Sequence, residues 1–79
     1  MKMSIQYCTS WGYLARAARV ADVVANKFGN DVEIDLIPSS GGVFEIKLDG
    51  ELFFSKKETG RFPDQDEIDG MLNTIAGKK

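Results

Sequence analysis

Hydrophobic and polar residues alternate in the first segment of the chain, and a helical period follows. In 2–7 every odd-numbered position is apolar or aromatic and its neighbours are polar, which predicts a β-strand. The next apolar residues recur at three- and four-residue spacing and predict one stripe of a helix: Leu14, Ala17, Ala18, Ala21, Val24, Ala25 and Phe28. We expect Thr9 or Ser10 to cap the start of this helix and Gly29-Asn30 to end it in a left-handed conformation.

Alternation returns in three shorter segments. Apolar and acidic residues alternate over 32–36, and Pro38 is expected to end that strand. The pattern resumes over 44–48, and Asp49-Gly50, a dipeptide typical of two-residue hairpin turns, connects it to a partner strand at 51–55. The sequence therefore predicts one strand followed by an antiparallel hairpin.

The last part of the chain begins as a loop and ends as a helix. The stretch 56–63 is polar and is expected to be a loop. Asp64 and Glu67 have the spacing of a capping box, in which each side chain accepts a hydrogen bond from the other residue's backbone N–H. The apolar residues that follow form the predicted buried stripe of this helix: Ile68, Met71, Leu72 and Ile75.

The resulting order, β-α-β-β-β-α, predicts an α/β (α+β) two-layer sandwich in one domain over 1–79. We expect a four-stranded mixed sheet with the first strand central, the 32–36 strand on one side and the hairpin on the other. Both helices should pack on one face of the sheet and bury the following residues: Leu14, Ala21, Phe28, Ile68, Leu72 and Ile75.

Composition removes several classes of function. A net charge of -2 and a pI near 5.0 argue against nucleic acid as a partner. The chain has one Cys and no His, so an internal disulfide, the common zinc sites and a His-based catalytic triad are all excluded, and no cofactor is expected. With no apolar run of membrane-spanning length and no signal-peptide pattern at the start, we expect a cytoplasmic protein that does not contact membranes.

One thiol remains as a candidate for side-chain chemistry. Cys8 ends the first predicted strand and lies just before a helix, where unpaired N–H groups and the helix dipole stabilise a thiolate. This position predicts a partly accessible thiol with a lowered pKa. The alternative is a buried Cys that acts as a small hydrophobic residue.

The segment 7–13, Tyr-Cys-Thr-Ser-Trp-Gly-Tyr, resembles the Tyr-Cys-x-x-Sec-Gly-Tyr motif of the selenoprotein W-like (Rdx) family. The likeness continues in further blocks, in the order expected for the family: 28–29, 41–46, 49–57, 60–63 and 67–68. The resemblance implies a thioredoxin-like fold and thiol oxidoreductase activity, with glutathione or protein thiols as partners. It also implies the two site residues, Cys8 and the position of Trp11.

Trp11 stands where the family carries selenocysteine or Cys, and indole cannot attack a mixed disulfide as a second thiol would. Three accounts remain open. The second redox centre has been lost in this protein, or Trp11 stands for a selenocysteine codon, or Trp11 is a structural aromatic that shields Cys8.

Basic residues form the last candidate group: Arg16, Arg19, Lys56, Lys57 and Arg61. They form either a solvated face or a cationic rim that holds an anionic thiol such as glutathione, whereas Tyr7, Tyr13 and Phe62 are expected to be packing residues. Two functions follow. The chain is either a thiol-redox protein that uses Cys8, or a non-catalytic module that binds a regulatory protein through the loop at 8–13.

Overall fold

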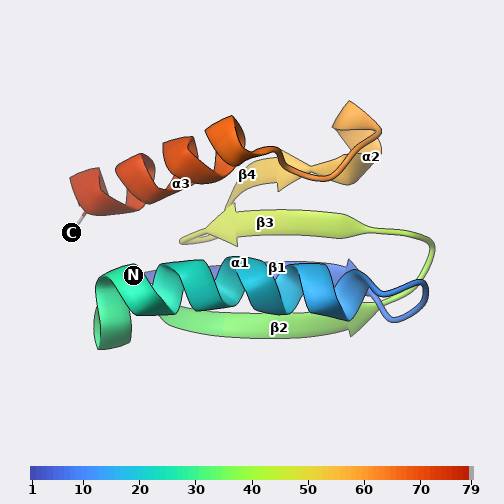
Figure 1. The fold of residues 1–79 in the computed structure, drawn as a ribbon, viewed down its shortest axis with the longest axis horizontal. Coiled ribbons are helices and arrows are strands. Elements are labelled where there is room, and N and C mark those ends of the chain that lie inside the picture. The colour runs from blue at the N-terminus through green and yellow to red at the C-terminus, as the bar shows by residue number, and fades with distance from the viewer. Residues whose placement is uncertain (79) are drawn as a thin grey trace.

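Four strands form one mixed sheet in the computed structural model, which describes residues 1–78. The elements in chain order are β1 (Lys2–Cys8), α1 (Tyr13–Phe28), the 3-10 turn η1 (Gly29–Asp31), β2 (Glu33–Ser39), β3 (Phe44–Leu48), β4 (Glu51–Ser55), the short helix α2 (Lys56–Thr59) and α3 (Gln65–Lys78). The strand order is β2-β1-β3-β4, with β1 parallel to β2 and antiparallel to β3. The predicted central position of the first strand is therefore confirmed (Figure 1).

The predicted hairpin turn is also confirmed. Asp49 and Gly50 have φ angles of 51° and 85°, and a two-residue hairpin turn of this hand needs positive φ at both central positions. The Asp49 side chain fixes the turn to the central strand, because its Oδ1 accepts a 2.8 Å hydrogen bond from the Lys2 N–H.

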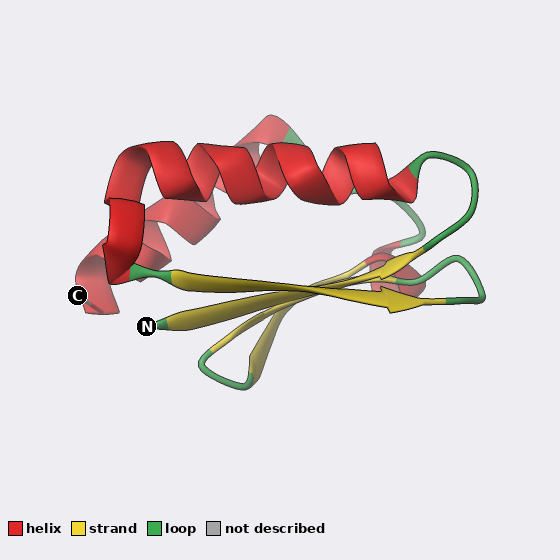
Figure 2. Cartoon of the chain, turned by 90° about the horizontal axis from the view of Figure 1, so that it is seen from below, coloured by secondary structure: helices red, strands yellow, loops and turns green. Residues whose placement is uncertain are grey.

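The helices α1 and α3 cover one face of the sheet (Figure 2). The core between the layers contains residues of β1, β3, β4 and both long helices, and Ile34 of β2 packs against it. Its fully buried large side chains are Met3, Ile5, Val24, Phe44, Ile46, Met71 and Ile75. The reciprocal capping box at the start of α3 is present, since the Glu67 N–H donates to Asp64 and the Asp64 N–H donates to Glu67. Within residues 1–78, none of the helices is long and apolar enough to cross a membrane.

The buried stripe of α1 differs from the predicted one. Tyr13, Ala17, Val20, Val24 and Phe28 are buried, whereas Leu14 is 51% exposed, Ala25 is exposed and Ala21 is only half-buried. The helix is turned so that the larger Tyr13 and Val20 contact the core. The prediction failed because small alanines fit the three- and four-residue spacing on two neighbouring stripes.

The predicted cap of α1 is wrong as well. Neither Thr9 nor Ser10 caps the helix with its side chain, because Trp11 and Gly12 lie between them and the first helical turn in left-handed conformations. Gly12 is the cap residue. At the other end, Gly29 ends the helix with a positive φ of 59°, but its ψ of -132° lies outside the left-handed helical region that was expected, and it leads into η1.

Two boundaries after α1 also need correction. Pro38 lies inside β2, opposite Tyr7 of β1, rather than ending the strand. Proline is tolerated there because β2 is an edge strand, where a missing N–H removes no necessary ladder bond. The stretch after β4 is not all loop: α2 begins there because the Ser55 Oγ accepts a hydrogen bond from the Glu58 N–H.

The corrected stripe of α1 predicts different stabilities for two matched variants. Val20→Ala should lower the free energy of unfolding by about 1.5–3 kcal/mol, because it removes two buried methyl groups and leaves a cavity. Leu14→Ala should change it by less than about 0.5 kcal/mol, since that side chain is half exposed. Urea unfolding of both variants measures the difference, and a larger loss for Leu14→Ala would contradict the packing of α1.

Candidate thiol site at the end of strand β1

Cys8 is the last residue of the central strand β1, and two loops meet at this end of the sheet (Figure 1). The loop after β1 leads into α1, and the loop between β2 and β3 lies beside it. Backbone hydrogen bonds join the two: the Cys8 N–H donates to the Val43 carbonyl at 2.9 Å, and the Thr9 N–H donates to the Ser39 carbonyl at 3.1 Å. The thiol is thus positioned by strands β1 and β2 and by the residue before β3.

Hydrogen-bond donors of two loops lower the pKa of the Cys8 thiol. The largest cause is the backbone N–H of Ser10, which burial of the thiol opposes. The Gly42 N–H and the Ser10 hydroxyl add to the lowering of the pKa. The predicted direction is confirmed, but the donors belong to two loops. The helix α1 begins only at Tyr13, after the loop that carries Ser10.

The predicted accessibility of the thiol is wrong. Cys8 is only 2% exposed and belongs to the hydrophobic core cluster. Loop 40–43 lies against this residue, since the Val43 carbonyl accepts from the Cys8 N–H and the Gly42 N–H acts on the thiol. A buried Cys and a Cys with a lowered pKa are alternatives in the prediction from the sequence. In the structure, Cys8 is buried and its thiol also has a lowered pKa.

Trp11 lies in a different environment from Cys8. Its side chain is 82% exposed, and its ring centroid is 6.4 Å from that of Tyr13. Such exposure does not support a packed aromatic that shields the thiol. The backbone of Trp11 has a φ of 57°, a left-handed conformation that costs a residue with a side chain about 1–2 kcal/mol. Strain of this kind is concentrated at functional sites.

A cluster of three aromatic rings connects the start of α1 and the start of β3 to the segment that precedes α3. Tyr13 meets Phe62 edge to face at 4.8 Å between centroids, and Phe62 meets Phe44 in the same way at 5.2 Å. Two cations lie over these rings: the Arg16 guanidinium carbon is 4.2 Å from the Phe62 centroid, and the Lys56 Nζ is 5.5 Å from it. The expected packing role of Tyr13 and Phe62 is confirmed.

The predicted group of basic residues does not stay together. Arg16 and Lys56 converge on the aromatic cluster, but Arg61 forms ion pairs with Asp64 and Glu67 at the start of α3. Arg61 therefore belongs to the cap of α3. Lys57 lies exposed on α2, as expected for a solvated side chain.

Sequence reasoning missed the two backbone donors, Ser10 and Gly42. A signal for the second was present, because adjacent glycines such as Gly41-Gly42 often mark positions that need positive φ. Gly42 has a φ of 74°, and a Cβ added to it would lie 3.6 Å from the Tyr13 hydroxyl. Glycine therefore brings this N–H close to the thiol.

The fold is that of a thioredoxin-like domain. Its first strand ends at a cysteine just before a helix, and the same sheet contains a parallel crossover strand and a hairpin. The chain belongs to the Rdx family, whose family model matches residues 2–73. Family membership suggests a redox-related role.

Curated relatives support this assignment over most of the chain. Selenoprotein W of Danio rerio is 31% identical over 68 residues, which cover 84% of this chain and 79% of that protein. Migration and invasion enhancer 1 of Bos taurus is 31% identical over 79 residues, which cover 99% of this chain and 68% of that protein. Its Mus musculus counterpart is 33% identical over 64 residues, which are 81% of this chain and 55% of that protein.

Solved structures share the fold. A crystal structure from Bordetella parapertussis superposes with a TM-score of 0.83 at 34% identity, covering 92% of this chain and 94% of that one. The selenoprotein W-related protein of Vibrio cholerae gives a TM-score of 0.76 at 24% identity, covering 90% of this chain and 95% of its own. The second likeness shows the fold alone.

The donors around the sulfur predict how one hydroxyl affects reactivity. Ser10→Ala removes a donor, so the pKa of the Cys8 thiol should rise and alkylation should slow at pH values below the ordinary pKa of Cys. The thiolate contributes stability above the unfolded-state pKa and loses it as the pH falls through the lower folded-state pKa, and this pH dependence should weaken in the variant. The alkylation rate against pH measures the shift. The matched control is Ser40→Ala in the exposed loop, and an equal shift there would contradict the assignment.

Proposed function

We propose that this protein is a one-thiol redox protein that uses the Cys8 thiolate as its nucleophile. The observation that supports it best is the set of N–H and hydroxyl donors from Ser10 and Gly42, which lower the pKa of the thiol and so raise its thiolate fraction near neutral pH. The partner is glutathione or a protein thiol. A cytoplasmic location, where such thiols are abundant, agrees with this chemistry and stays a prediction.

The reaction is thiol–disulfide exchange in two steps. In the first, the Cys8 sulfur attacks one sulfur of an oxidised disulfide such as glutathione disulfide, the S–S bond breaks, and one glutathione thiolate leaves. Cys8 is then oxidised to a mixed disulfide and the departing thiol is reduced. In the second, an external thiolate attacks the mixed disulfide at the glutathione sulfur and releases Cys8 as the thiolate.

Access to the sulfur requires a local opening, since Cys8 is 2% exposed. The loop 40–43 carries both Gly42, a donor to the sulfur, and Val43, the acceptor of the Cys8 N–H. Loops of this kind open at a lower free energy than the core. The reaction rate therefore combines the population of the open loop with the thiolate fraction.

Glutathione disulfide tests the proposal directly. The wild-type protein should form one mixed disulfide at Cys8 and keep it until an external thiol is added, because the chain has no second cysteine to resolve it. Intact mass spectrometry measures the adduct, with Cys8→Ser as the control. A wild-type protein that stays unmodified over hours at neutral pH, while it alkylates after unfolding, would contradict the redox function.

Trp11→Cys should restore a resolving thiol. Position 11 lies three residues after Cys8, inside the turn in which the Tyr13 N–H donates to the Ser10 carbonyl at 3.4 Å, and its side chain is exposed. The variant should form an internal disulfide and release glutathione without added thiol. Thr9→Cys, with its thiol adjacent to Cys8 in sequence, is the matched control, since adjacent cysteines rarely reach disulfide geometry.

Absence of an internal disulfide in Trp11→Cys under oxidising glutathione would favour the second candidate, a non-catalytic module that binds a regulatory protein. One specific observation supports that candidate: Trp11 is 82% exposed and Leu14, at the start of α1, is 51% exposed. Exposed Trp residues are common energetic centres of protein interfaces.

A further inference from the structure

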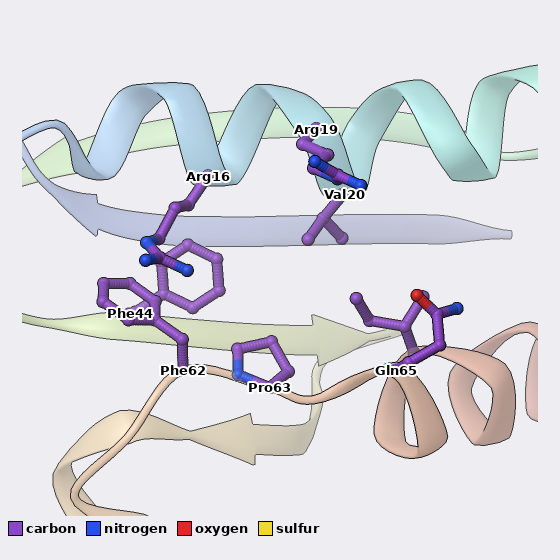
Figure 3. A pocket seen from close by; sticks show the side chains of 8 residues that line it. Arg16, Arg19, Val20, Phe44, Phe62, Pro63 and Gln65 are labelled. Carbon is purple, nitrogen blue, oxygen red and sulfur yellow. The ribbon is translucent and has the colours of Figure 1, made fainter.

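A pocket of about 230 Å³ lies between α1 and the segment that leads into α3 (Figure 3). Arg16, Arg19 and Val20 of α1 form one wall, and Phe62, Pro63 and Gln65 form the opposite one. The Phe44 and Phe62 rings lie beside each other at the end of the pocket below Arg16. Cys8 is not among the lining residues, so the pocket is separate from the thiol site.

The two arginines carry positive charge without acidic partners. Within residues 1–78, neither Arg16 nor Arg19 has a carboxylate within 4.0 Å, whereas Lys2 and Arg61 both form ion pairs. In the part of the chain that the structure describes, no acidic residue lines the pocket; Glu67 at the start of α3 pairs with Arg61, and Asp69 accepts a hydrogen bond from the Gln65 Nε2. The pocket therefore presents unneutralised guanidinium groups.

Arg16 is also oriented in advance. Its guanidinium carbon lies 4.2 Å from the Phe62 centroid, and a planar cation held over a ring loses little freedom when its N–H donors bind an anion. Those donors are the fork that matches a carboxylate in a bidentate way. The apolar walls next to the fork suit the body of the same ligand.

We propose that this pocket binds a small carboxylate with an aromatic body, its anionic group on Arg16 and Arg19 and its ring between Val20, Phe62 and Pro63. The volume is below the 300–1,000 Å³ of pockets for drug-sized ligands, which limits the occupant to a compact molecule. A neutral molecule of the same shape would leave the two guanidinium groups without a partner.

Benzoate is the probe, titrated into the ¹⁵N-labelled full chain and followed by amide chemical shifts. Saturable shifts should appear at Val20, Phe62 and Gln65, with affinity in the millimolar range that a ligand of this size can reach. Benzamide, the neutral isostere, should bind about tenfold more weakly or not at all, as the loss of charge-assisted hydrogen bonds implies.

Variants locate the charge that matters. Arg19→Gln should weaken benzoate binding about tenfold while the amide spectrum shows an intact fold, and Lys27→Gln, which removes one positive charge at the other end of α1, should leave the affinity unchanged. Cys8→Ser should bind benzoate as the wild type does, so this result stands apart from the redox proposal. The absence of saturable shifts, equal affinity for benzamide, or an equal loss in Lys27→Gln would each overturn the proposal.

Discussion

Backbone hydrogen bonding at the end of the central strand is the constraint on which the rest of this structure depends. Because β1 pairs on both sides, its last residue is held by the Val43 carbonyl, and the next residue is held by the Ser39 carbonyl. These bonds fix the loops after β1 and after β2 against each other. The position of the thiol, its burial and its donors all follow from that arrangement.

The hydrogen-bond donors that lower the pKa of Cys8 belong to these loops. The backbone takes left-handed conformations at Trp11 and Gly12 before α1 begins, and the Ser10 N–H in the same loop is the largest cause that lowers the pKa of the thiol. On the other side, the positive φ of Gly42 brings a second N–H close. Two short loops thus stabilise a thiolate in a core position, where burial alone would raise the pKa.

Much of the fold could be predicted from the sequence, because local signals specify it. The alternation specifies the strands, Asp49-Gly50 the hairpin turn, and the capping box at Asp64 the start of α3. The rotation of α1 could not, since its alanines fit either stripe, and the packing of Tyr13 against Phe62 and of Val20 in the core depends on residues distant in sequence. At the site, the position of Cys8 and the direction of its pKa were predictable. Its burial was not, because that depends on loop 40–43, which is distant in sequence.

The central claim is that the folded protein lowers the pKa of the Cys8 thiol. The direct measurement is a pH titration of the thiolate ultraviolet absorbance of the wild-type protein, with Cys8→Ser subtracted to remove the tyrosine signal. The account predicts a midpoint below the pKa of about 8.5 of a free cysteine and a return to that value when the protein is unfolded in urea. A midpoint at or above the free-cysteine value in the folded protein would contradict it.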